Sequence, residues 1–158
     1  MSKYIHKSHN VSVIMYHIVC PVKYRRVIFE TEEIDKELSD ICEEISNRYE
    51  IEFIEIGADK EHVHFLVQSI PRYSPSEVVR IIKSITAKEM FKRKPEIKKK
   101  LWGGQFWSKG YFISTVGQYT NEEVIKKYVS NQGKEIEYKR IKKYEQLSMF
   151  ESEGYNED

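Results

Sequence analysis

Residues 51–69 have the sequence IEFIEIGADKEHVHFLVQS, and this pattern predicts two β-strands joined by a tight turn. The strands, Ile51–Ile56 and His62–Ser69, are rich in the β-branched and aromatic side chains that are typical of strands. Between them, Gly57-Ala58-Asp59-Lys60 is typical of a hairpin turn. We therefore expect an antiparallel pair of strands in the middle of the chain.

Strands and capped helices alternate on both sides of this hairpin. Thr31 is a typical N-cap, and Ser74-Pro75-Ser76-Glu77 combines a cap, a first-turn proline and a capping-box glutamate. The predicted elements are strands at 11–20 and 111–116, and helices at 32–49, from 75 to before Pro95, from 120, and at 135–149. This order favours an α+β fold of ferredoxin-like or RRM-like type, in which a mainly antiparallel sheet carries helices on one face.

The composition indicates one domain of ordinary size. The chain has 158 residues, of which 40% are hydrophobic, so it can bury a core, and residues 1–149 show no domain boundary before an acidic tail at 150–158. A total of 26 basic residues against 25 acidic ones excludes a strongly basic nucleic-acid-coating protein. No membrane span or signal peptide is predicted, and two cysteines cannot form a disulfide framework, so we expect a cytoplasmic protein with no membrane partner.

The net charge of +1 conceals a division along the chain. Between Glu30 and Glu61, thirteen acidic residues stand against three basic ones. From Arg80 to Gly110 the sign reverses, with ten basic residues against two acidic ones. The second stretch is therefore a candidate for phosphate binding, although a helix with a solvated basic face explains the same charge.

Two histidines in the predicted strand 62–69 are candidate metal ligands. Alternation along a strand places His62 and His64 on the same face, with their Cα atoms about 7 Å apart, and convergent imidazoles at that distance can hold one metal ion. Two half-exposed strand histidines are the alternative. Asp59 lies just upstream and could orient the rings as a hydrogen-bond acceptor, or could be an ordinary surface carboxylate in a turn.

A further pair of polar side chains lies in the predicted helix that begins near residue 120. Tyr128 and Gln132 are four residues apart, so the phenol and the carboxamide share one helix face. A tyrosine on a helix is more often a core residue with a satisfied hydroxyl, and periodicity alone does not select Tyr128 among the 11 tyrosines.

Four motifs taken together resemble the single-tyrosine transposases of the HUH endonuclease superfamily, which are enzymes of single-strand-transposing insertion sequences. The motifs are HVHFLV at 62–67 preceded by Asp59, LWGGQFWS at 101–108, GYF at 110–112 and YVSNQ at 128–132. The resemblance extends from about residue 9 to Gln132. Cys20 departs from it, since a larger apolar or aromatic residue is expected there, and this affects core packing rather than a motif.

The resemblance implies roles for particular residues. His62, His64 and Gln132 would hold a divalent metal, Mg²⁺ or Mn²⁺, and Tyr128 would be the nucleophile that cuts and rejoins single-stranded DNA through a 5′-phosphotyrosine. The chain has no Gly-rich phosphate loop, in agreement with chemistry that needs no nucleotide cofactor. The resemblance also implies a homodimer in which the helix bearing Tyr128 and Gln132 completes the partner's site, and DNA substrates with hairpin ends.

Several cations and rings are expected to contact this DNA, because basic side chains bind phosphates and aromatic rings stack on unpaired bases. They are Lys23, Arg25, Arg26, Arg80, Lys83, Lys88, Arg93, Trp102 and Trp107. For most of the aromatic rings near the Trp-Gly-Gly loop, packing into the core is the more common alternative. Two alternatives remain open from the sequence. One is a domesticated relative that uses the same chemistry on chromosomal repeats, and the other is a non-catalytic module that binds single-stranded nucleic acid.

Overall fold

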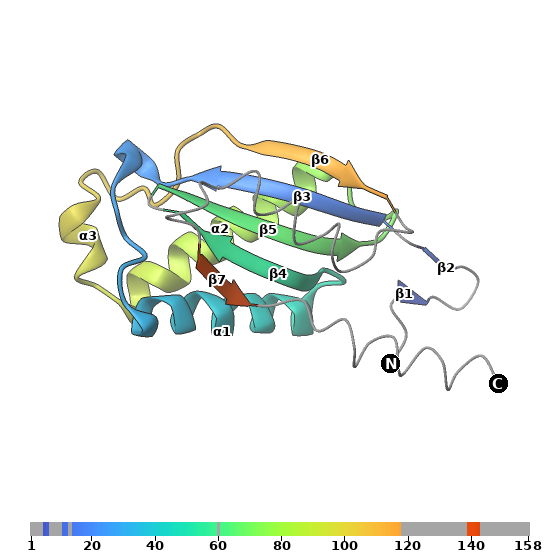
Figure 1. Cartoon of the computed structure of the whole chain (residues 1–158), viewed down its shortest axis with the longest axis horizontal. Coiled ribbons are helices and arrows are strands. Elements are labelled where there is room, and N and C mark those ends of the chain that lie inside the picture. The colour runs from blue at the N-terminus through green and yellow to red at the C-terminus, as the bar shows by residue number, and fades with distance from the viewer. Residues whose placement is uncertain (1–4, 7–10, 13, 60, 118–138, 143–158) are drawn as a thin grey trace.

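A five-stranded antiparallel sheet of order β6-β3-β5-β4-β7 forms the centre of the molecule (Figure 1). The computed structural model describes residues 5–6, 11–12, 14–59, 61–117 and 139–142. The strands of the sheet are β3 (Ile14–Pro21), β4 (Glu52–Ala58), β5 (His62–Ser69), β6 (Phe112–Val116) and β7 (Lys139–Lys142). The short strands β1 (Ile5–His6) and β2 (Val11–Ser12) pair separately with each other.

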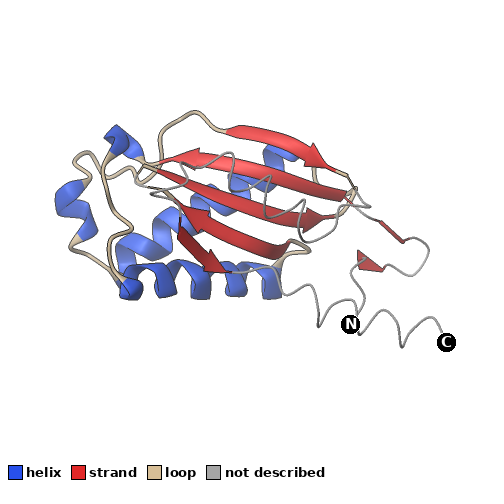
Figure 2. Cartoon of the chain, viewed as in Figure 1, coloured by secondary structure: helices blue, strands red, loops and turns tan. Residues whose placement is uncertain are grey.

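Helices α1 and α2 pack side by side against one face of this sheet (Figure 2). The helical elements are η1 (Lys23–Arg25), α1 (Glu32–Arg48), α2 (Pro75–Arg93) and α3 (Ile97–Lys100). The four strands β3 to β6 with the two long helices have the βαββαβ order of a ferredoxin-like fold. The prediction of an α+β fold of this type is confirmed.

Both long helices begin where the sequence predicts. The Oγ1 atom of Thr31 accepts a hydrogen bond from the backbone N–H of Ile34 at 3.2 Å. At the start of α2, Ser74 and Glu77 form a reciprocal capping box: each backbone N–H donates to the other's side chain, at 2.8 and 3.2 Å. The predicted caps at these two positions are confirmed.

The two faces of β5 have different surroundings. Val63, Phe65 and Val67 alternate toward α1 and α2 and belong to the hydrophobic core. His64 and Gln68 alternate toward the opposite face, where they are nevertheless buried. The hairpin of β4 and β5 therefore supplies part of the hydrophobic core on one face and buried polar side chains on the other.

The structure corrects the sequence-based elements at three places. Gly57 and Ala58, predicted in the hairpin turn, belong to β4 and pair with His64 and Val63. Residues 139–142, predicted within a helix at 135–149, form strand β7, which pairs antiparallel with the edge of β4. Pairing with an exposed strand edge satisfies backbone groups and overrides the helical preference of a charged segment. Helix α3 was not predicted. The helix expected from 120 and the tail 150–158 lie outside the described residues. Among the residues that the structure does describe, no helix is long and apolar enough to cross a membrane.

Candidate active site

Asp59 lies in the turn between β4 and β5 and fixes the start of β5. Its Oδ1 atom accepts hydrogen bonds from the backbone N–H groups of Glu61 (3.0 Å) and His62 (2.8 Å). An aspartate that binds the backbone two and three residues ahead is a common way to hold a tight turn. The predicted hairpin turn is thus held by a side chain within it.

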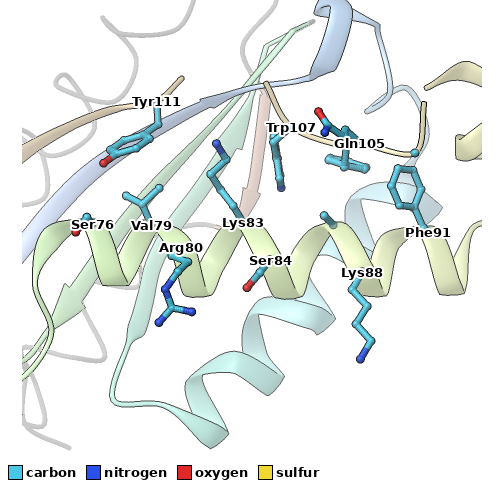
Figure 3. A pocket seen from close by; sticks show the side chains of 13 residues that line it. Ser76, Val79, Arg80, Lys83, Ser84, Lys88, Phe91, Gln105, Trp107 and Tyr111 are labelled. Carbon is cyan, nitrogen blue, oxygen red and sulfur yellow. The ribbon is translucent and has the colours of Figure 1, made fainter. Parts of the chain in front are cut away.

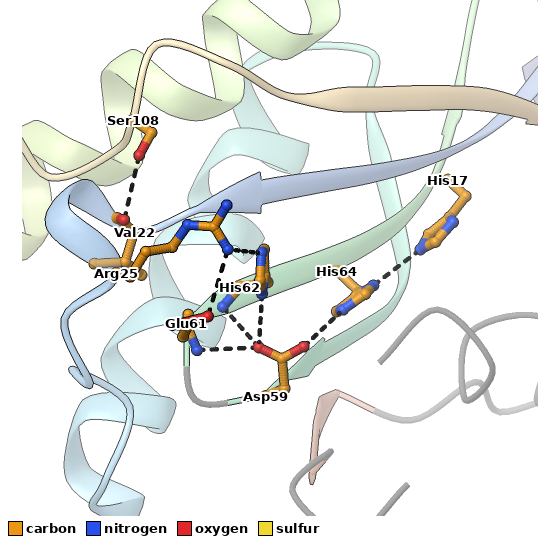
Figure 4. A network of polar contacts seen from close by, with 8 residues as sticks. All are labelled: His17, Val22, Arg25, Asp59, Glu61, His62, His64 and Ser108. Atoms are coloured by element: carbon orange, nitrogen blue, oxygen red, sulfur yellow. Dashed lines mark hydrogen bonds and ion pairs between the residues drawn. The ribbon is translucent and has the colours of Figure 1, made fainter. Parts of the chain in front are cut away.

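The same carboxylate contacts both candidate metal-binding histidines (Figure 4). Asp59 Oδ1 lies 3.1 Å from His62 Nδ1, and Asp59 Oδ2 lies 3.5 Å from His64 Nε2. Burial alone would raise the pKa of Asp59. The hydrogen bonds from His64 and the two backbone N–H groups outweigh burial and hold that pKa well below its usual range. Asp59 is therefore an ionised acceptor that orients both rings.

His17 on β3 extends this cluster and was not singled out as a site residue from the sequence. A hydrogen bond of 3.2 Å joins His17 Nε2 to His64 Nδ1, and the two rings stack with their centroids 5.4 Å apart. Burial, and then the proximity of His64, lowers the pKa of His17 to about 3, so its ring is neutral at ordinary pH. In the sequence, His17 is a polar residue inside an apolar strand. It indicates a site residue only when β3 is known to pair with β5, which carries His64.

Arg25, predicted as a DNA contact, stands beside His62. Its Nη1 atom lies 3.0 Å from His62 Nε2 and 3.4 Å from Glu61 Oε1. Because ionised Asp59 can only accept, His62 Nδ1 donates to it, and His62 Nε2 accepts from Arg25. The η1 turn therefore brings a guanidinium to the exposed end of the histidine cluster.

A groove of about 560 Å³ lies between α2 and the loop that precedes β6 (Figure 3). Lys83 points from α2 toward this loop, and its Nζ atom donates to the backbone carbonyls of Ser108 (2.7 Å) and Lys109 (3.2 Å). Arg80 and Lys88 are exposed and point away from the loop. Lys83 thus ties the loop to the helix, whereas the other two cations face solvent.

Arg93, at the end of α2, contacts carboxylates on both long helices. Its guanidinium lies 2.6 Å from Glu44 and 3.6 Å from Glu37 on α1, and 3.2 Å from Glu89 on α2. An ion pair between Lys94 and Glu33 lies next to it. These cations join α2 to the acidic surface of α1, so part of the charge division in the sequence is an interhelical ion-pair network.

The two tryptophans predicted to contact DNA lie in opposite environments. Trp107 is only 6% exposed, packs against Phe106, and donates a hydrogen bond from Nε1 to Thr86 Oγ1 at 2.9 Å. An indole held in the core in this way is not open for stacking on a base. Trp102 is 75% exposed and lies against the ring of Tyr24.

The cluster at the start of β5 offers donors suited to a divalent cation. Two imidazoles and a carboxylate are ligand types that bind Mn²⁺, and carboxylates also suit Mg²⁺. Within the described part of the chain, no three His, Cys, Asp or Glu side chains form a complete ligand group. The predicted third ligand Gln132 and the predicted nucleophile Tyr128 lie outside the described residues.

The family model and the relatives that the sequence matches are all transposases. A model of the IS200-like transposase family matches residues 10–132. The ISDra2 transposase TnpA of Deinococcus radiodurans is 35% identical over 117 residues, which are 74% of this chain and 82% of that protein. The transposase for insertion sequence element IS200 of Salmonella typhimurium is 28% identical over 117 residues, 74% of this chain and 75% of that protein.

Two solved structures have a similar fold. A crystal structure from Deinococcus radiodurans assigned as a transposase has a TM-score of 0.63 and 28% identity, and the match covers 82% of this chain and 98% of that one. A REP-associated tyrosine transposase bound to a REP hairpin has a TM-score of 0.50 and 12% identity over 80% of this chain and 68% of that one, a likeness of fold alone. Because the family match spans most of the sequence and includes the histidine strand, the chain belongs to the IS200-like family of single-tyrosine transposases.

Proposed function

We propose that this chain cuts and rejoins single-stranded DNA at the ends of an insertion sequence through a phosphotyrosine at Tyr128. Membership of a transposase family implies DNA endonuclease and strand-transfer activity. The observation that carries the finer proposal is the cluster in which one carboxylate, Asp59, contacts both His62 and His64. Such a cluster has the donor chemistry of a site for phosphodiester cleavage.

His62, His64 and Gln132 would hold the divalent metal, Mg²⁺ or Mn²⁺. When bound, the metal would stabilise negative charge on the non-bridging oxygens of the reacting phosphate. Asp59 acts as a positioning residue, because it fixes the orientation and tautomer of His62. His62 Nε2 is engaged by Arg25, so a ligand at that nitrogen would release the guanidinium, which is suited to bind phosphate oxygens.

The proposed reaction needs no nucleotide cofactor. The phenol oxygen of Tyr128 attacks phosphorus and loses its proton, the bond from phosphorus to the 3′-oxygen breaks, and that oxygen takes up a proton to leave as a 3′-hydroxyl. Because a tyrosine has a pKa near 10, its proton must be removed as it attacks. The product is itself a phosphodiester, so the 3′-hydroxyl of another DNA end can reverse the step and join a new strand.

The proposed assembly is a homodimer with composite sites on DNA that carries hairpin ends. In each site, the helix with Tyr128 and Gln132 from one protomer would complete the His62 and His64 cluster of the other. The sequence motifs support the proposed dimer, and a fold shared with a REP-associated tyrosine transposase that is bound to a REP hairpin supports the proposed hairpin substrate.

The direct test is an adduct assay with single-stranded oligonucleotides that carry the ends of the chain's own element. Incubation with Mn²⁺ should give a protein–DNA adduct that survives SDS, and EDTA or a duplex of the same sequence should abolish it. Tyr128→Phe removes the nucleophile, whereas Tyr111→Phe removes the hydroxyl of an exposed tyrosine elsewhere. We expect an adduct with Tyr111→Phe and none with Tyr128→Phe.

An undiminished adduct in Tyr128→Phe would overturn the assignment of the nucleophile. The non-catalytic module makes the opposite prediction, since it would bind single strands without a divalent ion and His62→Ala would leave its function intact. A domesticated relative would give the same adduct, and the neighbourhood of its gene, without flanking element ends, would distinguish it.

A further inference from the structure

The most exposed aromatic side chain described by the structure lies next to a second exposed ring. Trp102 is 75% exposed and Tyr24 is 47% exposed, and their ring centroids are 5.9 Å apart in an edge-to-face arrangement. Large aromatic rings are usually buried, as Trp107 is at 6%. An exposed pair of this kind is the signature of a surface that contacts another molecule.

The backbone that presents this pair is held in an unfavourable conformation. Tyr24 has φ 59° and Arg25 has φ 54°, in the left-handed region that non-glycine residues rarely adopt. Across from them, Gly103 has φ 90°, and a side chain there would contact the hydroxyl of Tyr24. Strained residues persist where surrounding structure holds them and cluster at functional sites.

The surrounding structure anchors this turn firmly. Val22 forms a β-bridge with Trp107, and the backbone N–H of Lys23 donates to the carbonyl of Phe106 at 2.8 Å. The η1 turn, which carries Tyr24, and the loop after α3, which carries Trp102, are thus joined at one end of the sheet (Figure 1). The two rings are therefore presented in a fixed relation before any ligand binds, which reduces the ordering cost of binding.

One cation lies at the ring pair, and others lie on the two segments that carry the rings. Lys23 Nζ lies 5.2 Å from the centre of the Tyr24 ring, and Arg25 reaches His62 Nε2 at 3.0 Å. Helix α3, directly before Trp102, carries three exposed lysines, of which Lys98 lies over the ring of Phe91 and Lys100 contacts Glu30. Aromatic platforms flanked by basic side chains bind unpaired nucleotides, because the rings stack on bases and the cations attract phosphates.

We infer that Tyr24 and Trp102 form a platform on which an unpaired base of single-stranded DNA stacks, beside the His62 end of the active site. The choice of DNA as the ligand rests on the proposed function. The platform would hold the strand next to the reacting phosphate, with Arg25, which adjoins Tyr24 in the chain and lies beside His62, available to bind a phosphate of that strand. Stacking tolerates different bases, so the platform would position the strand and leave sequence selection to other contacts.

Tryptophan fluorescence tests the platform without any cleavage step. A short thymidine oligonucleotide should quench the emission of the wild-type protein, whereas an abasic oligonucleotide of equal length and charge should not. In Trp102→Phe, which keeps an aromatic ring but leaves Trp107 as the remaining fluorophore, the quenching should disappear while affinity stays close to that of the wild type. Trp102→Ala should bind the thymidine oligonucleotide about tenfold more weakly and the abasic one equally well.

Absence of quenching in the wild type, or equal weakening of thymidine and abasic binding by Trp102→Ala, would overturn the platform. A stronger response to a uridine ribo-oligonucleotide would overturn the assignment of DNA as its ligand. The Tyr128→Phe variant separates this inference from the proposed function. The thymidine oligonucleotide should quench its emission as in the wild type, although the variant forms no adduct. Quenching in a wild-type protein that never forms an adduct would support the platform and count against the transposase chemistry.

Discussion

Two regions of the molecule carry clustered cations, the η1 turn with Arg26 and helix α2, and the structure uses them differently. In α2, Lys83 donates to backbone carbonyls of the loop before β6, and Arg93 contacts carboxylates on α1 and α2. These groups hold elements of the fold together. In the turn, Arg25 contacts His62, and Arg26 is exposed next to it.

The difference shows that the density of positive charge along a sequence does not identify a DNA-binding surface. Ten basic residues between Arg80 and Gly110 make that stretch a candidate for phosphate binding, although part of this charge is paired within the protein. The η1 turn is shorter, yet its cations lie beside the histidine cluster and the exposed ring pair. We expect the turn to govern DNA cleavage and α2 to govern stability.

The largest effect expected from this comparison is that of Arg25→Gln on cleavage. The substitution removes a guanidinium 3.0 Å from His62 Nε2. Loss of one group that stabilises developing charge at a reacting phosphate typically slows a reaction by about 10²-fold. The rate of SDS-stable adduct formation at saturating oligonucleotide should fall by that order, with the melting temperature close to that of the wild type.

The matched control is Arg26→Gln. It removes the same charge from the next residue, whose side chain is exposed. It should slow adduct formation by a few-fold at most. Equal effects of the two substitutions would mean that the turn contributes only general attraction for DNA, and the contact between Arg25 and His62 would then have no special role.

A smaller effect, on stability, is expected for Lys83→Met. Methionine keeps the apolar stem but leaves the carbonyls of Ser108 and Lys109 without their charged donor. Hydrogen bonds that involve a charged group contribute a few kcal/mol, so the free energy of unfolding in urea should fall by about 2 kcal/mol. Lys88→Met, on the same helix but exposed, should change it by less than about 0.5 kcal/mol. Similar values for both variants would show that Lys83 does not anchor the loop.

The fold could be predicted from the sequence where local signals and tertiary packing agree. The capping residues Thr31 and Ser74 and the alternation along β5 each depend on a few neighbouring residues, and the structure has them as predicted. The hairpin turn is also present, but it begins two residues later than predicted, because Gly57 and Ala58 pair within the sheet. Strand β7 could not be predicted, because its conformation comes from pairing with the edge of β4 and not from its own charged sequence.

The candidate site could be predicted only in part, because some of its residues are brought together by pairing between distant segments. His62, His64 and Asp59 lie within six residues of one another, so alternation and turn chemistry bring them together. His17 and Arg25 come from segments about 40 residues away, and only the pairing of β3 with β5 and the left-handed turn place them against the histidines. The burial of Trp107 and the exposure of Trp102, in one motif, likewise depend on the fold around them.

The smallest effect is expected for Arg93→Gln, and its salt dependence would sharpen the comparison. Arg93 is partly exposed, and partly exposed ion pairs contribute up to about 1 kcal/mol at low ionic strength, a value that screening reduces. The free energy of unfolding should therefore fall by about that amount at low salt and by less at high salt.

DNA binding by Arg93→Gln shows whether this cation serves an ion pair within the fold or a contact to a DNA phosphate. Each phosphate contact to a single strand contributes about 0.7 to the slope of log affinity against log salt concentration. Because the guanidinium of Arg93 is engaged by Glu44 and Glu89, Arg93→Gln should leave that slope unchanged. A slope reduced by about 0.7 would mean that Arg93 leaves its carboxylates to bind phosphate. Helix α2 would then belong to the DNA-binding surface together with the η1 turn.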